Sequence, residues 1–156
     1  SWCSGSTDYN DGINDVVFYH IYTHEITSSS SVLDIALDNN DIEMFKFLLS
    51  HPKIDVNILS KSNDISQTVL HRAVYEGKVE MVELLLSHPK IDVNIPQTKK
   101  GYSNTETKTA LHIAYQRKNQ NIINLLLKRN DINVDALDYN GKKPSYYENY
   151  KSYYRW

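Results

Sequence analysis

The eleven residues LLSHPKIDVNI occur twice in this chain, at positions 48–58 and again at 85–95. An identity of this length, displaced by 37 positions within 156 residues, indicates an internal repeat. Repeats with a period of this size are typical of stacked architectures, in which each unit buries its apolar face on its neighbours. The doubled segment therefore predicts a fold that grows by adding similar units along one axis.

Three units share one pattern of helix signals. Equivalent leucines stand at Leu33, Leu70 and Leu111, and equivalent alanines at Ala36, Ala73 and Ala114, with steps of 37 and 41 residues. A hydroxyl residue that can cap a helix start precedes each stretch, at Ser31, Thr68 and Thr109. Asn40 and Gly77 follow, which are residues that tolerate the left-handed conformation at a helix end. A second apolar-periodic stretch ends before Pro52 and Pro89, so each unit is expected to contain two short helices.

The segments TVLHRA, GKVEMVELLL and IDVN resemble the ankyrin repeat over about residues 31–135. The resemblance implies an all-α solenoid of stacked helix-turn-helix units with extended finger loops. It divides the chain into repeats at 31–67, 68–108 and 109–142, followed by a partial repeat with a Tyr-rich cap at 143–156. Residues 1–30 are expected to hold a capping helix with Ile13, Val16, Val17 and Ile21 on one face; whether this helix belongs to a degenerate repeat stays open.

Compared with the family's unit of about 33 residues, the surplus length falls in the connecting segments 58–67 and 95–108. Insertions are tolerated where the chain projects into solvent, so these segments are predicted to be the projecting fingers. The resemblance implies that fingers and front helices line a concave groove that binds another protein. The candidate contact residues are Asp38, Asn39, Arg72, Tyr75, Glu76, Gln116 and Arg117 on the front helices, Lys61, Lys99, Lys100 and Tyr102 on the fingers, and Tyr147, Tyr154 and Trp156 at the C-terminal end.

The net charge of −2 conceals a strong asymmetry. Residues 1–94 contain 6 Lys and Arg against 14 Asp and Glu, whereas residues 95–156 contain 11 against 5. The groove is therefore expected to change from acidic to basic along the stack. Nucleic-acid binding through the basic final third is a weaker alternative, because the rest of the chain is acidic and no nucleic-acid motif is present.

Six tyrosines lie between positions 139 and 156. On a helix, Tyr146, Tyr150 and Tyr153 would share one face, with Tyr147 and Tyr154 beside them. This cluster is interpreted first as a cap that seals the third repeat and second as an aromatic contact surface for a partner. Both roles are compatible.

Patterns for catalysis and cofactors are absent from the sequence. It has no glycine-rich phosphate loop, no G-x-S-x-G and no H-E-x-x-H. His20 and His24 have the spacing of a metal pair but lack further ligands, so no metal or cofactor is expected. By the resemblance, His71 and His112 are structural, and Asp34 in the equivalent position is expected to weaken that link.

The lone Cys3 fits a reducing, intracellular setting, most simply the cytoplasm; the chain does not begin with Met, so a removed leader stays open. No apolar run approaches the roughly 20 residues of a membrane helix, so no membrane insertion is expected. The sequence thus favours a non-enzymatic scaffold or adaptor that binds a protein of unknown identity. The alternative is a structural subunit held permanently in a larger assembly.

Overall fold

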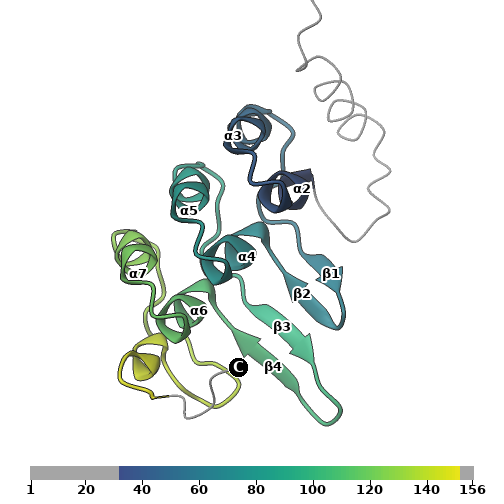
Figure 1. Ribbon diagram of the computed structural model, residues 1–156. Coiled ribbons are helices and arrows are strands. Elements are labelled where there is room, and N and C mark those ends of the chain that lie inside the picture. The colour runs from purple at the N-terminus through teal and green to yellow at the C-terminus, as the bar shows by residue number, and fades with distance from the viewer. Residues whose placement is uncertain (1–31, 152–156) are drawn as a thin grey trace, which may run out of the picture.

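The computed structural model describes residues 32–151, which form three helix pairs and one small sheet. Unit 1 contains α2 (Val32–Asp38) and α3 (Ile42–Ser50), unit 2 contains α4 (Val69–Tyr75) and α5 (Val79–Leu86), and unit 3 contains α6 (Ala110–Gln116) and α7 (Gln120–Leu127). The front helices α2, α4 and α6 lie in one row and the rear helices α3, α5 and α7 in a second row (Figure 1). The predicted capping helix and the Ser31 cap lie outside the described residues.

The helix boundaries follow from caps and left-handed turns. Thr68 and Thr109 have extended backbones at the starts of α4 and α6, and each takes part in a capping box with the histidine three residues later. The helix-to-helix turns contain Asn40, Gly77 and Lys118 at φ values of 52°, 71° and 57°. The predicted turn residues Asn40 and Gly77 thus have the left-handed conformation. Lys118 has it too, although lysine is not a residue type that favours this conformation.

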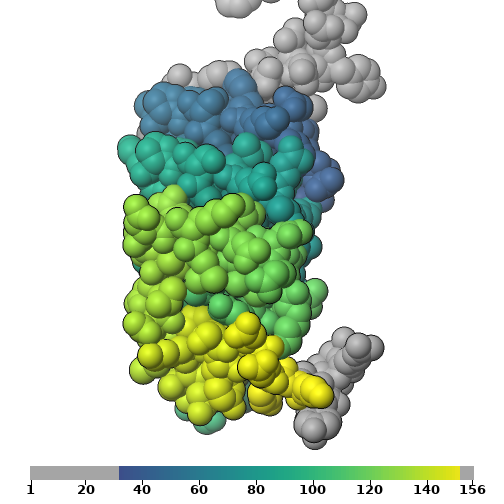
Figure 2. Space-filling model, turned by 90° about the vertical axis from the view of Figure 1, so that its left-hand side faces the viewer, coloured from purple at the N-terminus to yellow at the C-terminus, as the bar shows by residue number. Residues whose placement is uncertain are grey.

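The units stack in chain order, as the coloured layers of Figure 2 show. Ala36, Ala73 and Ala114 are at most 2% exposed and lie where helices of neighbouring units approach each other. Larger apolar side chains such as Phe45, Leu48 and Leu85 fill the space between the two rows and are fully buried. The solenoid of stacked helix pairs expected from the repeat pattern is therefore confirmed.

The fingers correct the prediction of an all-α fold with loop-like fingers. β1 (Ser60–Ser62) and β2 (Ile65–Gln67) form one hairpin, and β3 (Gln97–Lys100) and β4 (Thr105–Lys108) form a second. β2 also pairs with β3, which gives an antiparallel four-stranded sheet in the order β1-β2-β3-β4. The first hairpin closes through Asn63 and Asp64, both with positive φ, which is the two-residue turn that matches strand twist.

The repeated segment LLSHPKIDVNI connects neighbouring units. The side chain of Asn57 donates to the carbonyl of Lys90 at 2.8 Å and accepts from the backbone N–H of Asp92 at 2.9 Å. Asn94 repeats both bonds one unit later, to Asp131 and from Asn133. Because each copy makes the same two inter-unit bonds, stacking explains why this asparagine occurs in both copies.

The end of the described chain is shorter than a regular repeat and buries only a few residues, Asp138, Pro144 and Tyr147. A 3₁₀ helix, η1 (Pro144–Glu148), takes the place of the expected continuing helix. The hydroxyl of Tyr147 donates to Asp138, whose other oxygen accepts from the backbone N–H groups of Asn140 and Lys142 at 2.9 Å each. With Tyr147 only 8% exposed, the interpretation of this segment as a cap on unit 3 is supported.

Candidate functional site

The register of the sheet decides which finger side chains point toward the front helices. Gln97 is opposite Lys108, and Lys99 is opposite Glu106, so these four side chains share one face of the sheet. On that face, the Lys108 ammonium donates to the side-chain oxygen of Gln116, at the end of α6, at 3.3 Å. We call this the inner face of the sheet, because it is turned toward the front helices.

Lys61 and Lys100 lie on the opposite, outer face. Lys100 is adjacent to Lys99 on β3, so its side chain points to the other face of the sheet. Thr98 points to that same face, and the register joins it to Ser66 and Ser66 to Lys61. Lys61 and Lys100 therefore point away from the front helices. A hollow of about 280 Å³ on this side is lined by Lys61, Ser62, Asn63, Asp64, Ile65, Ser66, Thr98 and Lys100. The three finger lysines proposed as contacts are therefore divided between two surfaces, with Lys99 alone on the inner one.

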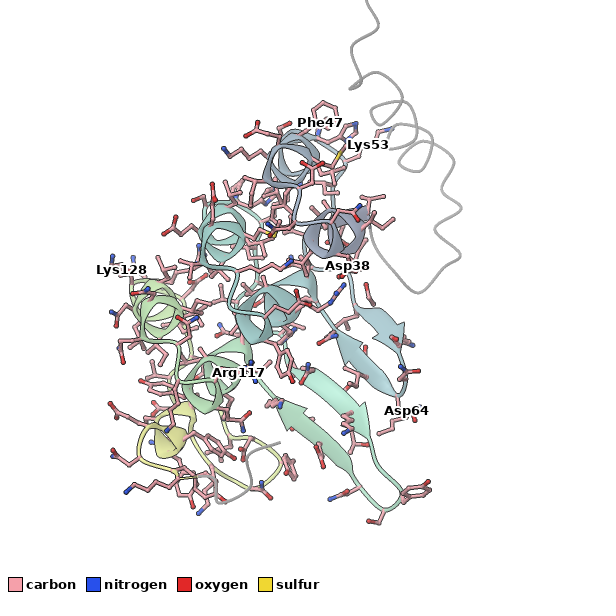
Figure 3. All side chains as sticks on the ribbon, viewed as in Figure 1. Asp38, Phe47, Lys53, Asp64, Arg117 and Lys128 are labelled. Carbon is pink, nitrogen blue, oxygen red and sulfur yellow. The ribbon has the colours of Figure 1, made fainter. Side chains whose placement is uncertain are left out.

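The ends of the front helices present equivalent positions side by side. Tyr75 on α4 is 53% exposed, and the guanidinium of Arg117, at the end of α6, lies over its ring with 4.6 Å to the centroid. Figure 3 labels Asp38 and Arg117 at the ends of α2 and α6. A continuous row of side chains connects the second finger to the ends of α4 and α6. We call this row the inner surface; it consists of Lys99, Lys108, Gln116, Arg117 and Tyr75.

Arg72, which the resemblance places toward the groove, also forms ion pairs within the chain. Its guanidinium pairs with the buried Asp34 at 3.2 Å, with Glu76 at 3.3 Å and with Asp38. Asp34 is 2% exposed and also accepts from the Ser60 hydroxyl at 2.7 Å. This carboxylate therefore joins α2 to both α4 and the first finger, whereas the link to the cap residue Ser31, which the sequence predicts to be weakened, lies outside the described residues.

The charges of the two halves of the inner side differ in how they are compensated. Glu76 pairs with both Arg72 and Lys78, and Asp34 and Asp38 pair with Arg72, so the carboxylates of the front helices of units 1 and 2 are paired with cations. Burial lowers the pKa of Lys108, and the neighbouring Lys99 contributes in the same direction while Glu106 and Asp138 oppose it. A partly desolvated cation therefore lies in the wall between β4 and α6.

The two buried histidines hold backbone rather than substrate. Nδ1 of His71 accepts from the Thr68 backbone N–H at 3.0 Å, and Nε2 lies 2.7 Å from the carbonyl of Ile95, so Nε2 carries the proton. Burial lowers the pKa of His71 to about 4. His112 repeats this pattern with Thr109 and the carbonyl of Lys142. Within residues 32–151 no group of His, Cys, Asp and Glu is arranged to hold a metal ion.

The remaining predicted contacts are scattered. Tyr102, at the tip of the second hairpin, and Asn39 are exposed. Tyr147 is buried against Asp138, which corrects its placement on a contact surface. Tyr154 and Trp156 lie outside the described residues. Of the candidate contacts, the structure therefore brings together those of the inner surface and leaves the others apart.

Lys108 is not among the contact residues expected from the sequence, because the fingers were expected to be extended loops and no strand register was assigned to them. The alternation in QTKK and TETK, two short polar segments separated by a turn sequence, was a usable signal for a hairpin. In a hairpin, residues two apart on a strand share a face, and the register then places Lys99 and Lys108 on the same side of the sheet.

Comparison with known families agrees with this architecture. The family described as ankyrin repeats in three copies matches residues 9–97, and the single ankyrin repeat matches residues 108–139. The chain belongs to the ankyrin-repeat family. Ankyrin repeats are generally protein–protein interaction modules, and proteins built from them are generally non-enzymatic. No curated protein matches the chain.

Membrane insertion of this ankyrin-repeat chain was also considered. Between residues 32 and 151, none of the helices combines the length and the apolar character that crossing a bilayer demands.

Proposed function

We propose that this ankyrin-repeat protein is a non-enzymatic scaffold or adaptor that binds a protein partner in a concave groove lined by the inner surface. The observation that carries the proposal is the exposed pair of Tyr75 and Arg117 beside Lys108 and Gln116. The core clusters behind the front helices and the asparagine bonds account for the stack without these side chains. A half-exposed aromatic ring with a guanidinium is a combination that is enriched in interface hot spots.

The basic residues of the final third favour a protein partner over nucleic acid. Arg129 pairs with Asp131 at 2.8 Å and Lys143 with Asp135 at 2.9 Å, while Lys118 donates to carbonyls of the cap. Lys128 lies on the rear side, at the end of α7 (Figure 3). The cations thus point in several directions, whereas a phosphate backbone is bound by a continuous basic stripe.

Site-specific photocrosslinking in extract of the cells that produce the protein tests the groove. A photoreactive residue is placed at Gln116 on the inner surface, at Lys61 on the outer face of the sheet, or at Glu80 on the rear helix α5, all three being exposed. We expect a discrete crosslinked protein from Gln116 and much less from the other two positions. Crosslinks that form mainly from Glu80 would show that the partner binds the rear side, which contradicts the proposal.

A further inference from the structure

The inner surface carries three cations, Lys99, Lys108 and Arg117, beside the carboxylate of Glu106. Among the ion pairs in the described part of the chain, none involves Lys99, Lys108 or Arg117. By contrast, the cations toward the N-terminal side, Arg72 and Lys78, are paired with carboxylates. Three cations of the described chain that are in none of these ion pairs therefore lie at the junction of units 2 and 3.

These cations are held close together by neighbouring contacts. Lys99 and Lys108 share the inner face of the sheet and repel one another, while Lys108 contacts Gln116, the residue before Arg117. Bringing like charges together and partly removing one from water is unfavourable for the protein alone. Glu106 on the same face offsets part of this cost for Lys108. Further carboxylates from a ligand would offset more of it, so the three cations are complementary to negative charge.

We propose that the junction of units 2 and 3 binds an extended acidic peptide segment, with its carboxylates on Lys99, Lys108 and Arg117 and its intervening residues over Tyr75. This inference rests on the proposed function and specifies the chemistry of the partner. An extended segment fits because alternate residues of such a chain point to one side, which allows side chains to contact the sheet and the helix ends in turn.

A protein segment fits this junction better than a nucleic acid does. Glu106 shares the inner face with Lys99, and Glu76 lies at the end of α4 next to Tyr75. These carboxylates would repel a continuous phosphate backbone, whereas a peptide can place neutral residues opposite them. The exposed ring of Tyr75 also offers apolar contact area to such neutral side chains.

The test uses a fluorescein-labelled peptide of alternating Glu and Thr, titrated with the full chain at low salt, and the same peptide with Gln in place of Glu. We expect the Glu peptide to bind and the Gln peptide to bind at least about tenfold more weakly, since charge-assisted bonds are lost. Lys99→Ala, or Arg117→Ala, is expected to weaken binding by about threefold to tenfold.

Lys100→Ala provides a matched control, because it removes the same charge from the neighbouring residue on the outer face. We expect this variant to bind like the wild type, with circular dichroism verifying that all variants fold. Equal losses from Lys99→Ala and Lys100→Ala would indicate diffuse attraction and overturn the inference. Absence of binding to the Glu peptide, or tighter binding to a single-stranded oligothymidine, would overturn it as well.

The two proposals can fail separately. If a natural partner crosslinks to Gln116 but the acidic peptide does not bind, the groove function stands and the acidic chemistry is wrong. If the peptide binds as expected but no crosslink forms at Gln116, the surface has affinity for acidic segments without a protein partner in that extract, which contradicts the proposed function.

Discussion

Asp34 of unit 1 and His71 of unit 2 occupy the same position of the repeat, yet they impose different requirements on their surroundings. Both side chains are buried, at 2% and 1% exposure. Asp34 is a carboxylate that is stabilised by the guanidinium of Arg72 and the hydroxyl of Ser60. His71 is neutral and is satisfied by the backbone of Thr68 and Ile95. A buried anion needs a cation from the next unit, and a neutral imidazole does not.

The two junctions also differ in the contacts of their arginines. Arg72 follows the unit that contains the anion and is bonded to three carboxylates. Arg117 follows the unit that contains the histidine and contacts an exposed tyrosine ring. The first junction thus uses its arginine in ion pairs, whereas the second has an arginine, at a different position of the repeat, that contacts an exposed tyrosine ring.

The largest expected effect comes from removing the cation at the first junction. Arg72→Ala leaves the buried Asp34 and the nearby Asp38 without their guanidinium, so we expect a loss of about 3 kcal/mol in the free energy of unfolding. Arg117→Ala is the matched control and is expected to lose less than about 1 kcal/mol, because its ring contact is solvent-exposed. Urea unfolding followed by circular dichroism measures both values.

Similar losses for the two arginines would break the comparison. In particular, a small loss for Arg72→Ala would mean that Ser60 and other contacts of Asp34 suffice for the carboxylate. The role assigned to the arginine at the first junction would then be wrong.

Lowering the pH tests whether the buried His71 is neutral in the folded chain. The pKa of His71 is about 4 in the folded chain because the ring is buried, against about 6.5 in the unfolded chain. Between these values the unfolded state binds more protons, so stability is fully present above about pH 6.5 and is lost as the pH falls toward 4. Nearby Lys108 opposes protonation of His71, and the carbonyl of Ile95 favours it. We expect His71 to account for about 3 kcal/mol of this loss.

The measurement is urea unfolding at a series of pH values for the wild type and for His71→Gln. The variant is expected to be less stable near neutral pH but to have a shallower dependence below it, the difference in slope reaching about 1.4 kcal/mol per pH unit. Equal slopes would show that His71 does not titrate differently on folding, and the contrast with Asp34 would lose its electrostatic basis.

The sequence was sufficient for the stack and insufficient for the sheet. The helices follow from short-range signals, such as Thr68 at a helix start and Gly77 at a turn, together with the repeated leucines that report burial. The fingers contain mainly polar residues, and their pairing depends on two hairpins that lie 30 or more residues apart, as Ile65 and Lys99 do. Pairing at this distance leaves no local signature in one sequence.

The candidate contacts show the same division. Tyr75 and Arg117 could be placed next to each other because they occupy neighbouring repeat positions, and the structure finds them in contact. The burial of Tyr147 could not be predicted, because it depends on the hydrogen bond to Asp138, and the sequence does not show that these two residues meet in the folded cap. Repeat position therefore predicts which front-helix residues meet, whereas burial at an irregular end depends on contacts that the pattern does not contain.

The smallest expected effect concerns the pair that we regard as free for binding. In a double-mutant cycle of Tyr75→Leu and Arg117→Met, which keeps apolar volume at both positions, we expect a coupling energy of about 0.5–1 kcal/mol in urea unfolding. Such a value means that breaking the contact between the guanidinium and the ring, so that the guanidinium can bind a ligand, costs little free energy. A coupling above about 2 kcal/mol would make this contact as much a part of the fold as Arg72 is. The junction of units 2 and 3 would then lack a readily available arginine, and the acidic segment would have to depend on the two lysines alone.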